Sequence, residues 1–124
     1  MTRHALLALL FLAFVPALAP LAGCKSYHID STVENRTGAA IELLEVDYPS
    51  ASFGADTLSA NADLHYRFQV RLSGPVKVQY TESATHQVRQ MTGPTVFEKQ
   101  EGRLEIVLLP GGKAEFHPAL TPQP

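Results

Sequence analysis

The sequence predicts an all-β protein: an antiparallel β-sandwich of immunoglobulin-like type with about seven strands. Apolar residues alternate with polar ones, with a period of two, over most of the chain after residue 27. No apolar stripe with helical periodicity is long enough to predict a helix. Gly, Pro, Asn and Asp recur between the alternating segments, at spacings of about ten residues. A small closed β-barrel is the alternative, because it has the same alternation.

The first two predicted strands are joined by a short polar turn. Residues 29–34 alternate and predict a strand, and Asn35-Arg36-Thr37-Gly38 predicts the turn after it. The second strand covers residues 40–48, and its apolar side chains change face midway. Ile41 and Leu43 precede the change, and Leu44, Val46 and Tyr48 follow it. A β-bulge, or burial of both faces, explains such a change.

Residues 50–57 predict a loop or an irregular edge strand. Tyr48-Pro49 precedes this segment and interrupts regular pairing, because proline has no N–H to donate. The segment is rich in small and polar residues around Phe53. The aromatic rings of Tyr48 and Phe53 belong either to a packed corner or to an exposed recognition loop. We favour the packed corner.

Residues 64–72 alternate strictly and predict the clearest strand of the protein. Ser73-Gly74-Pro75 then predicts a hairpin connection to a second alternating segment, residues 76–80. Pairing Leu72 with Val76 would put every apolar side chain of this hairpin on one side. The solvent face of the hairpin would then carry a basic stripe made of Arg67, Arg71 and Lys77, with Arg89 beside it.

The C-terminal part predicts shorter strands. Residues 86–91 form a weak strand that Thr92-Gly93-Pro94 breaks, and residues 95–97 add a short edge piece. The nearly continuous apolar run at residues 104–109 predicts a central strand. Residues 114–117 form the last strand, so the predicted domain covers residues 28–117, and the proline-rich residues 118–124 predict a disordered tail.

The N-terminus has the three parts of a secretory signal peptide over residues 1–23: a charged start, an apolar run and small residues before a cleavage site. The apolar run from Ala5 to Val15 is followed by Pro16. It is shorter than the roughly 20 residues that a membrane-spanning helix needs, and proline would break its continuation. This segment therefore predicts export and removal.

The segment Leu21-Ala22-Gly23-Cys24 resembles the lipobox of bacterial lipoproteins. The resemblance implies cleavage between Gly23 and Cys24 and a diacylglycerol on the Cys24 thiol, which would anchor the protein in a membrane of the cell envelope. Residues 24–27 would then be the lipidated cysteine and a short tether. By the same resemblance Lys25, in place of an aspartate, implies the outer membrane, with the protein facing the periplasm. Two or three acyl chains hold a protein on a bilayer almost permanently.

Composition excludes several classes of function. Removing residues 1–23 leaves 101 residues, which is enough for one domain. The formal charge of the mature chain is mildly negative, so nucleic acid is not an expected partner. Neither Ser50 nor Ser52 lies in the Gly-x-Ser-x-Gly turn of a hydrolase. We therefore expect no enzymatic activity and no cofactor.

Two hypotheses for the function remain. The leading one is a non-enzymatic interaction or structural module, in which the basic stripe either contacts an anionic partner, such as lipid head groups, lipopolysaccharide phosphates or an acidic protein, or only keeps the sheet soluble. The alternative is a periplasmic copper or zinc protein. Its ligands would come from separate strands, since no pair of histidines has strand or helix spacing. The candidates are His28, His65, His86 and His117.

Overall fold

The computed structural model describes residues 26–122, and no helix is present within this range. The predicted signal peptide, Gly23, Cys24 and Lys25 lie outside the described residues. Eight strands follow one another along the chain. They are β1 (Ile29–Asn35), β2 (Ile41–Tyr48), β3 (Ala51–Leu58), β4 (Asp63–Phe68), β5 (Gly74–Glu82), β6 (Val88–Val96), β7 (Gly102–Leu109) and β8 (Lys113–Leu120).

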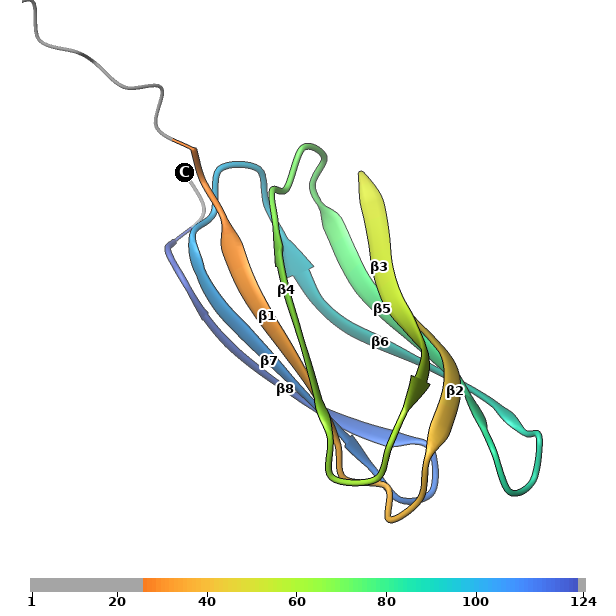
Figure 1. Cartoon of the computed structure of the whole chain (residues 1–124). Helices are drawn as coiled ribbons and strands as arrows, with labels where there is room; N and C mark the ends of the chain where they lie inside the picture. Colours follow the sequence, from red (N-terminus) through yellow and green to blue (C-terminus); the bar gives the residue numbers. More distant parts are fainter. Residues whose placement is uncertain (1–25, 123–124) are drawn as a thin grey trace, which may run out of the picture.

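The strands form two four-stranded sheets that face each other (Figure 1). One sheet has the order β4-β1-β7-β8 and the other the order β3-β2-β5-β6. All neighbouring pairs are antiparallel except β1 and β7, which run parallel. The predicted sandwich is therefore confirmed, with one strand more than expected, and the closed-barrel alternative is wrong.

The two ends of the sandwich differ in what they contain. The start of β1, the end of β8 and the β2–β3, β4–β5 and β6–β7 connections lie at one end, here called the terminal end (Figure 1). The β1–β2, β3–β4, β5–β6 and β7–β8 connections lie at the other, the distal end. Whatever precedes residue 26 in the chain is therefore joined to the terminal end.

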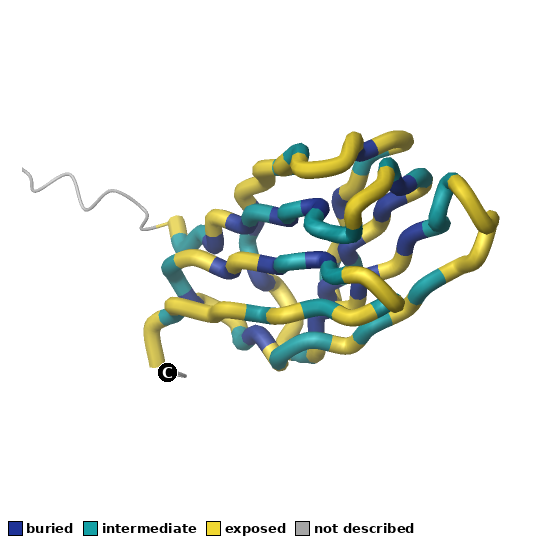
Figure 2. Tube along the Cα trace, turned by 90° about the horizontal axis from the view of Figure 1, so that it is seen from below, coloured by how far each residue is buried: buried dark blue, intermediate teal, exposed yellow. Residues whose placement is uncertain are grey.

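A single hydrophobic core lies between the sheets (Figure 2). Alternate side chains of β1 and β7, such as Val33 and Ile106, face Val78 and Tyr80 of β5, and all four are fully buried. Burying one such side chain stabilises the fold by about 1.5–3 kcal/mol. The period-two pattern of the sequence therefore correctly predicts which side chains of these strands point inward.

The change of face in the second strand is a β-bulge, which is one of the two explanations that the sequence left open. The pairing of β2 with β5 shifts register between Glu42 and Glu45. Within the bulge Leu43 has a φ of 51° and is 65% exposed, whereas Ile41 and Leu44 are buried. The extra residue thus turns Leu43 outward, so that Ile41 before it and Leu44 after it can both face the core.

The segment after Pro49 is an edge strand, β3, and its aromatic ring packs inward. Phe53 is 8% exposed and lies 4.6 Å from the ring of Tyr66, between ring centroids. The rings of Tyr48 and Phe68 stack on each other at 4.2 Å beside it. The packed corner is therefore confirmed over the exposed recognition loop. These rings close the side of the sandwich where β3 and β4 meet.

The predicted hairpin of residues 64–80 is wrong. β4 ends at Phe68 and pairs with β1, whereas β5 belongs to the opposite sheet. Residues 69–73 cross from one sheet to the other, so Leu72 does not pair with Val76 and is 56% exposed. Strict alternation shows which side chains share a face, but it does not show which strand lies alongside.

Two further boundaries differ from the prediction. Gly93 and Pro94 lie inside a continuous strand, β6, and an edge strand tolerates a proline whose missing N–H would have pointed outward. β8 continues to Leu120, where residues 118–120 pair with β7, so the tail predicted from Pro118 is three residues too long. Pro118 is tolerated for the same reason, because β8 is also an edge strand.

At the distal end the fully buried side chain of Asn35 joins three segments of the chain. Its Nδ2 donates to the carbonyl oxygens of Ala39, Leu58 and Ser59 at 2.8, 3.0 and 3.1 Å. Its Oδ1 accepts from the N–H and the hydroxyl of Thr37 at 3.1 and 2.7 Å. One amide therefore holds the β1–β2 turn against the end of β3.

We expect Asn35→Ala to lower the free energy of unfolding by about 3 kcal/mol or more, because the substitution leaves carbonyl groups beside the core without a donor. The measurement is urea unfolding followed by circular dichroism. The control is Gln90→Ala, which removes an exposed hydrogen bond to Gln79 and should cost less than about 0.5 kcal/mol. Equal losses for the two variants would contradict this role of Asn35.

Tyr80 is fully buried, and its hydroxyl has no hydrogen-bond partner among the described atoms. Burial, followed by the charge of Glu82, raises the pKa of Tyr80 above its ordinary value of 10.0. A raised folded-state pKa means that the neutral form stabilises the fold below pH 10 and that this contribution is lost as the pH rises further.

We therefore expect Tyr80→Phe to leave the free energy of unfolding at pH 7 unchanged or to raise it by up to about 1 kcal/mol. The variant should also lose less stability than the unmodified protein between pH 9 and 11. Urea unfolding at both pH values measures this, with Tyr66→Phe as an exposed control. A large loss of stability at pH 7 would show that the hydroxyl is bonded.

Candidate functional site

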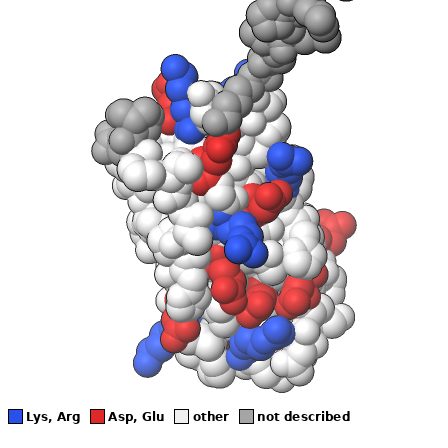
Figure 3. Space-filling view, turned by 90° about the vertical axis from the view of Figure 1, so that its left-hand side faces the viewer, with Lys and Arg blue, Asp and Glu red and all other residues white. Residues whose placement is uncertain are grey.

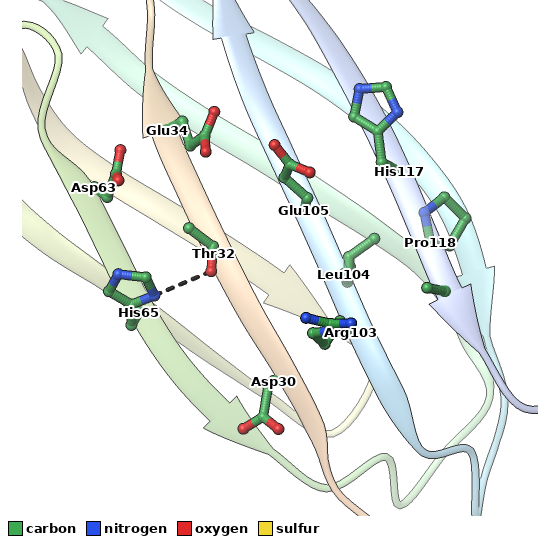
Figure 4. A pocket seen from close by; sticks show the side chains of 11 residues that line it. Asp30, Thr32, Glu34, Asp63, His65, Arg103, Leu104, Glu105, His117 and Pro118 are labelled. Atoms are coloured by element: carbon green, nitrogen blue, oxygen red, sulfur yellow. Dashed lines mark hydrogen bonds between the residues drawn. The ribbon is translucent and has the colours of Figure 1, made fainter.

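The outer face of the β4-β1-β7-β8 sheet carries a groove of about 620 Å³, here called the outer-face groove (Figure 4). All four strands contribute side chains to it. They include Asp30, Thr32 and Glu34 from β1, Asp63 and His65 from β4, Arg103 and Glu105 from β7, and His117 from β8. These residues alternate with core residues, so the strand pattern that builds the core also builds this polar surface.

Strand register places the centre of the groove in one row across the sheet. His65, Thr32, Glu105 and His117 are successive partners on β4, β1, β7 and β8. The Oγ1 of Thr32 lies 3.0 Å from the Nδ1 of His65, and the Nε2 of His117 lies 3.3 Å from a carboxylate oxygen of Glu115. Since two strands separate the histidines, they stand about 14 Å apart. These four side chains can therefore form hydrogen bonds with an extended partner, but they lie too far apart to bind a single atom together.

The charge of this face is mixed, with more acidic than basic side chains. Figure 3 shows Asp and Glu interspersed with Lys and Arg over it. Arg36 lies 3.4 Å from Asp63 and 3.8 Å from Glu34. Arg67 lies 3.7 Å from Asp30, and both of these side chains are about two-thirds exposed. Exposed pairs of this kind contribute little to stability, so they can exchange for contacts with a partner.

The four candidate metal-ligating histidines do not come together. His65 and His117 lie on the two edge strands of one sheet, His28 lies at the terminal end, and His86 lies in the β5–β6 turn at the distal end. Among residues 26–122, no group of three or more His, Cys, Asp and Glu side chains is arranged to hold a metal ion. The geometry therefore does not favour the copper or zinc hypothesis.

The predicted basic stripe does not exist, because it depended on the wrong hairpin. Arg67 is on β4 and Lys77 is on β5 of the opposite sheet, where Lys77 pairs with Asp47 and Thr92. The Nε of Arg89 donates to Glu82 at 2.9 Å. Hydrogen bonds from Thr85 and then Arg89 lower the pKa of Glu82, so Arg89 supports the β5–β6 turn.

Two residues of the predicted stripe nevertheless line the same hollow at the terminal end. Arg67 and Arg71 line a hollow of about 310 Å³, here called the terminal hollow, together with His28, Tyr48 and Tyr66. The sequence pattern does not reveal this hollow. It forms where residues 69–73 leave one sheet for the other, beside the start of β3. Guanidinium groups around a concave surface are suited to binding carboxylates or phosphates.

Comparison with known proteins supports the fold and leaves the function open. No protein family model matches the chain, and no curated protein matches it. The NMR structure of a protein from Eubacterium rectale is similar, with a TM-score of 0.52 and 14% sequence identity. The match covers 83% of this chain and 94% of that one. At this identity the likeness shows a shared fold alone.

Among the described residues, no helix is long and apolar enough to cross a membrane.

Proposed function

We propose that this chain is a lipid-anchored protein of the bacterial cell envelope that acts as a non-enzymatic interaction module on the periplasmic side of the outer membrane. The resemblance of Leu21–Cys24 to a lipobox supports the anchor at Cys24, and Lys25 supports the outer membrane. The outer-face groove is the surface that would contact a partner. Its open shape and interspersed charges suit a polar protein surface.

The observation that carries this proposal is the short distance along the chain between Cys24 and the fold. β1 begins at Ile29, five residues after Cys24. An extended chain covers at most about 3.5 Å per residue, so this tether could reach roughly 17 Å. An acylated Cys24 would hold the terminal end against the bilayer. The outer-face groove, which runs along the side of the sandwich, would then stay accessible from the periplasm.

The anchor predicts a specific modification. Mass spectrometry of the protein purified from envelopes should find Cys24 as the first residue, carrying a diacylglyceryl group. Cys24→Ser should remove the modification and prevent cleavage before residue 24. The wild-type protein should therefore partition into detergent, and the variant should not show a processed, acylated form. An N-terminus other than Cys24, or an unmodified Cys24 thiol, would contradict the anchor.

The interaction role predicts that partners contact one sheet and not the other. A photoreactive amino acid at Glu105, in the centre of the outer-face groove, should give a defined crosslinked product in living cells. The matched control is Gln79, which is exposed on the central strand β5 of the opposite sheet. Equal crosslinking from both positions, or none from Glu105, would contradict the assignment of the groove.

A further inference from the structure

The β4–β5 connection, residues 69–73, exposes an apolar side chain at the terminal end. Leu72 is 56% exposed, although it continues the alternating pattern of β4. It lies beside Arg71, which lines the terminal hollow, and the connection projects from the same end of the sandwich as the start of β1 (Figure 1). On a segment that is held at a bilayer, such a pair can contact both the acyl boundary, through the leucine, and the lipid phosphates, through the cation.

Hydrogen bonds fix this connection next to the start of the chain. The Nε2 of Gln69 donates to the Oγ of Ser26 at 3.3 Å, and Ser26 is two residues from Cys24. The guanidinium of Arg71 donates to the Oε1 of Gln69 at 3.3 Å, and the N–H of Arg71 donates to the Oγ of Ser50 at 3.3 Å. These bonds place Gln69 beside the point at which the tether leaves the domain, and Leu72 follows three residues later in the same connection.

The distribution of charge along the sandwich favours the same orientation. In the half of the sandwich nearer the terminal end the basic side chains are Arg67, Arg71, Lys77, Lys99 and Arg103, and the acidic ones are Asp30, Glu45, Asp47, Glu98, Glu101 and Glu105. Towards the distal end the acidic side chains are Glu34, Glu42, Asp56, Asp63, Glu82 and Glu115, and the basic ones among the described residues are Arg36, Arg89 and Lys113. The formal charge is therefore −1 in the first half (five basic, six acidic) and −3 in the second (three basic, six acidic), so an anionic bilayer would repel the terminal end less than the distal end.

We propose that residues 69–73 form a membrane-contact loop that places Leu72 among the lipid head groups, with Arg71 and Arg67 binding lipid phosphates. The terminal end of the sandwich then faces the bilayer, and the distal end points away from it. This inference rests on the proposed function, because the Cys24 anchor supplies the proximity. One leucine and two arginines bind a bilayer weakly by themselves, but a short tether gives them a high effective concentration at its surface.

The chain allows a direct test, because it contains no tryptophan and a single cysteine. The mature chain, residues 24–124, is coupled through Cys24 to a maleimide lipid in vesicles of phosphatidylethanolamine and phosphatidylglycerol. Leu72→Trp then introduces a single fluorescent reporter in the loop. The matched control is Val88→Trp, because Val88 is 53% exposed but lies at the distal end. Circular dichroism serves as the check that both variants fold.

The emission of Leu72→Trp should shift to shorter wavelength on coupling, and brominated lipids should quench it at least twofold. The emission of Val88→Trp should stay as in solution. In the Leu72→Trp background, Arg71→Glu should remove most of the quenching, whereas Lys113→Glu at the distal end should not. Equal quenching at positions 72 and 88, or none at 72, would overturn the proposal, and so would equal effects of the two charge reversals.

The chemical coupling separates this inference from the proposed function. Because the maleimide lipid replaces any cellular modification, the loop can be shown to contact lipid even if mass spectrometry finds Cys24 unmodified in cells. Conversely, an acylated Cys24 together with an unquenched Leu72→Trp would overturn the contact loop and leave the anchor standing.

Discussion

The buried amide of Asn35 is the interaction on which the arrangement of the strands most depends. At the distal end the chain must pass from β1 to β2 and from β3 to β4, and each passage changes sheet. Such crossings leave backbone carbonyl groups beside the core, where water cannot satisfy them. Asn35 supplies the missing donors at 2.8–3.1 Å and thereby fixes both crossings relative to each other. The apolar core can then close beside these crossings without leaving the three carbonyl groups unpaired.

These crossings decide where the surfaces of the molecule lie. The parallel pairing of β1 with β7 joins the first strand to a segment some seventy residues later in the sequence. It makes β1 a central strand, so that its outward side chains form the middle of the outer-face groove. It also puts both ends of the described chain at the terminal end (Figure 1). A lipid anchor ahead of β1 would therefore hold the terminal end at the bilayer and leave the outer-face groove facing along the membrane surface.

Features of the candidate sites that depend on neighbouring residues follow from the sequence pattern, whereas features that depend on strand pairing do not. The inward positions of β5, the bulge near Leu43 and the packed Phe53 all follow from alternation and from residue type, which act over a few neighbouring residues. The predicted basic stripe required residues 64–72 to pair with residues 76–80. This pairing is wrong, because β4 pairs with β1. Arg67 instead lies beside Asp30 of β1, and it lines the same hollow as Arg71 because residues 69–73 bend towards the opposite sheet.

The sequence by itself determined the all-β class, the inward faces of most strands and the resemblance to a lipobox, because each of these depends on local periodicity or a short motif. Only the tertiary structure decided the strand order, the parallel β1–β7 pair, the separation of the four histidines and the exposure of Leu72. Many pairings bury the same apolar faces almost equally well. The difference between them lies in long-range contacts, such as the hydrogen bonds of Asn35, that no local pattern encodes.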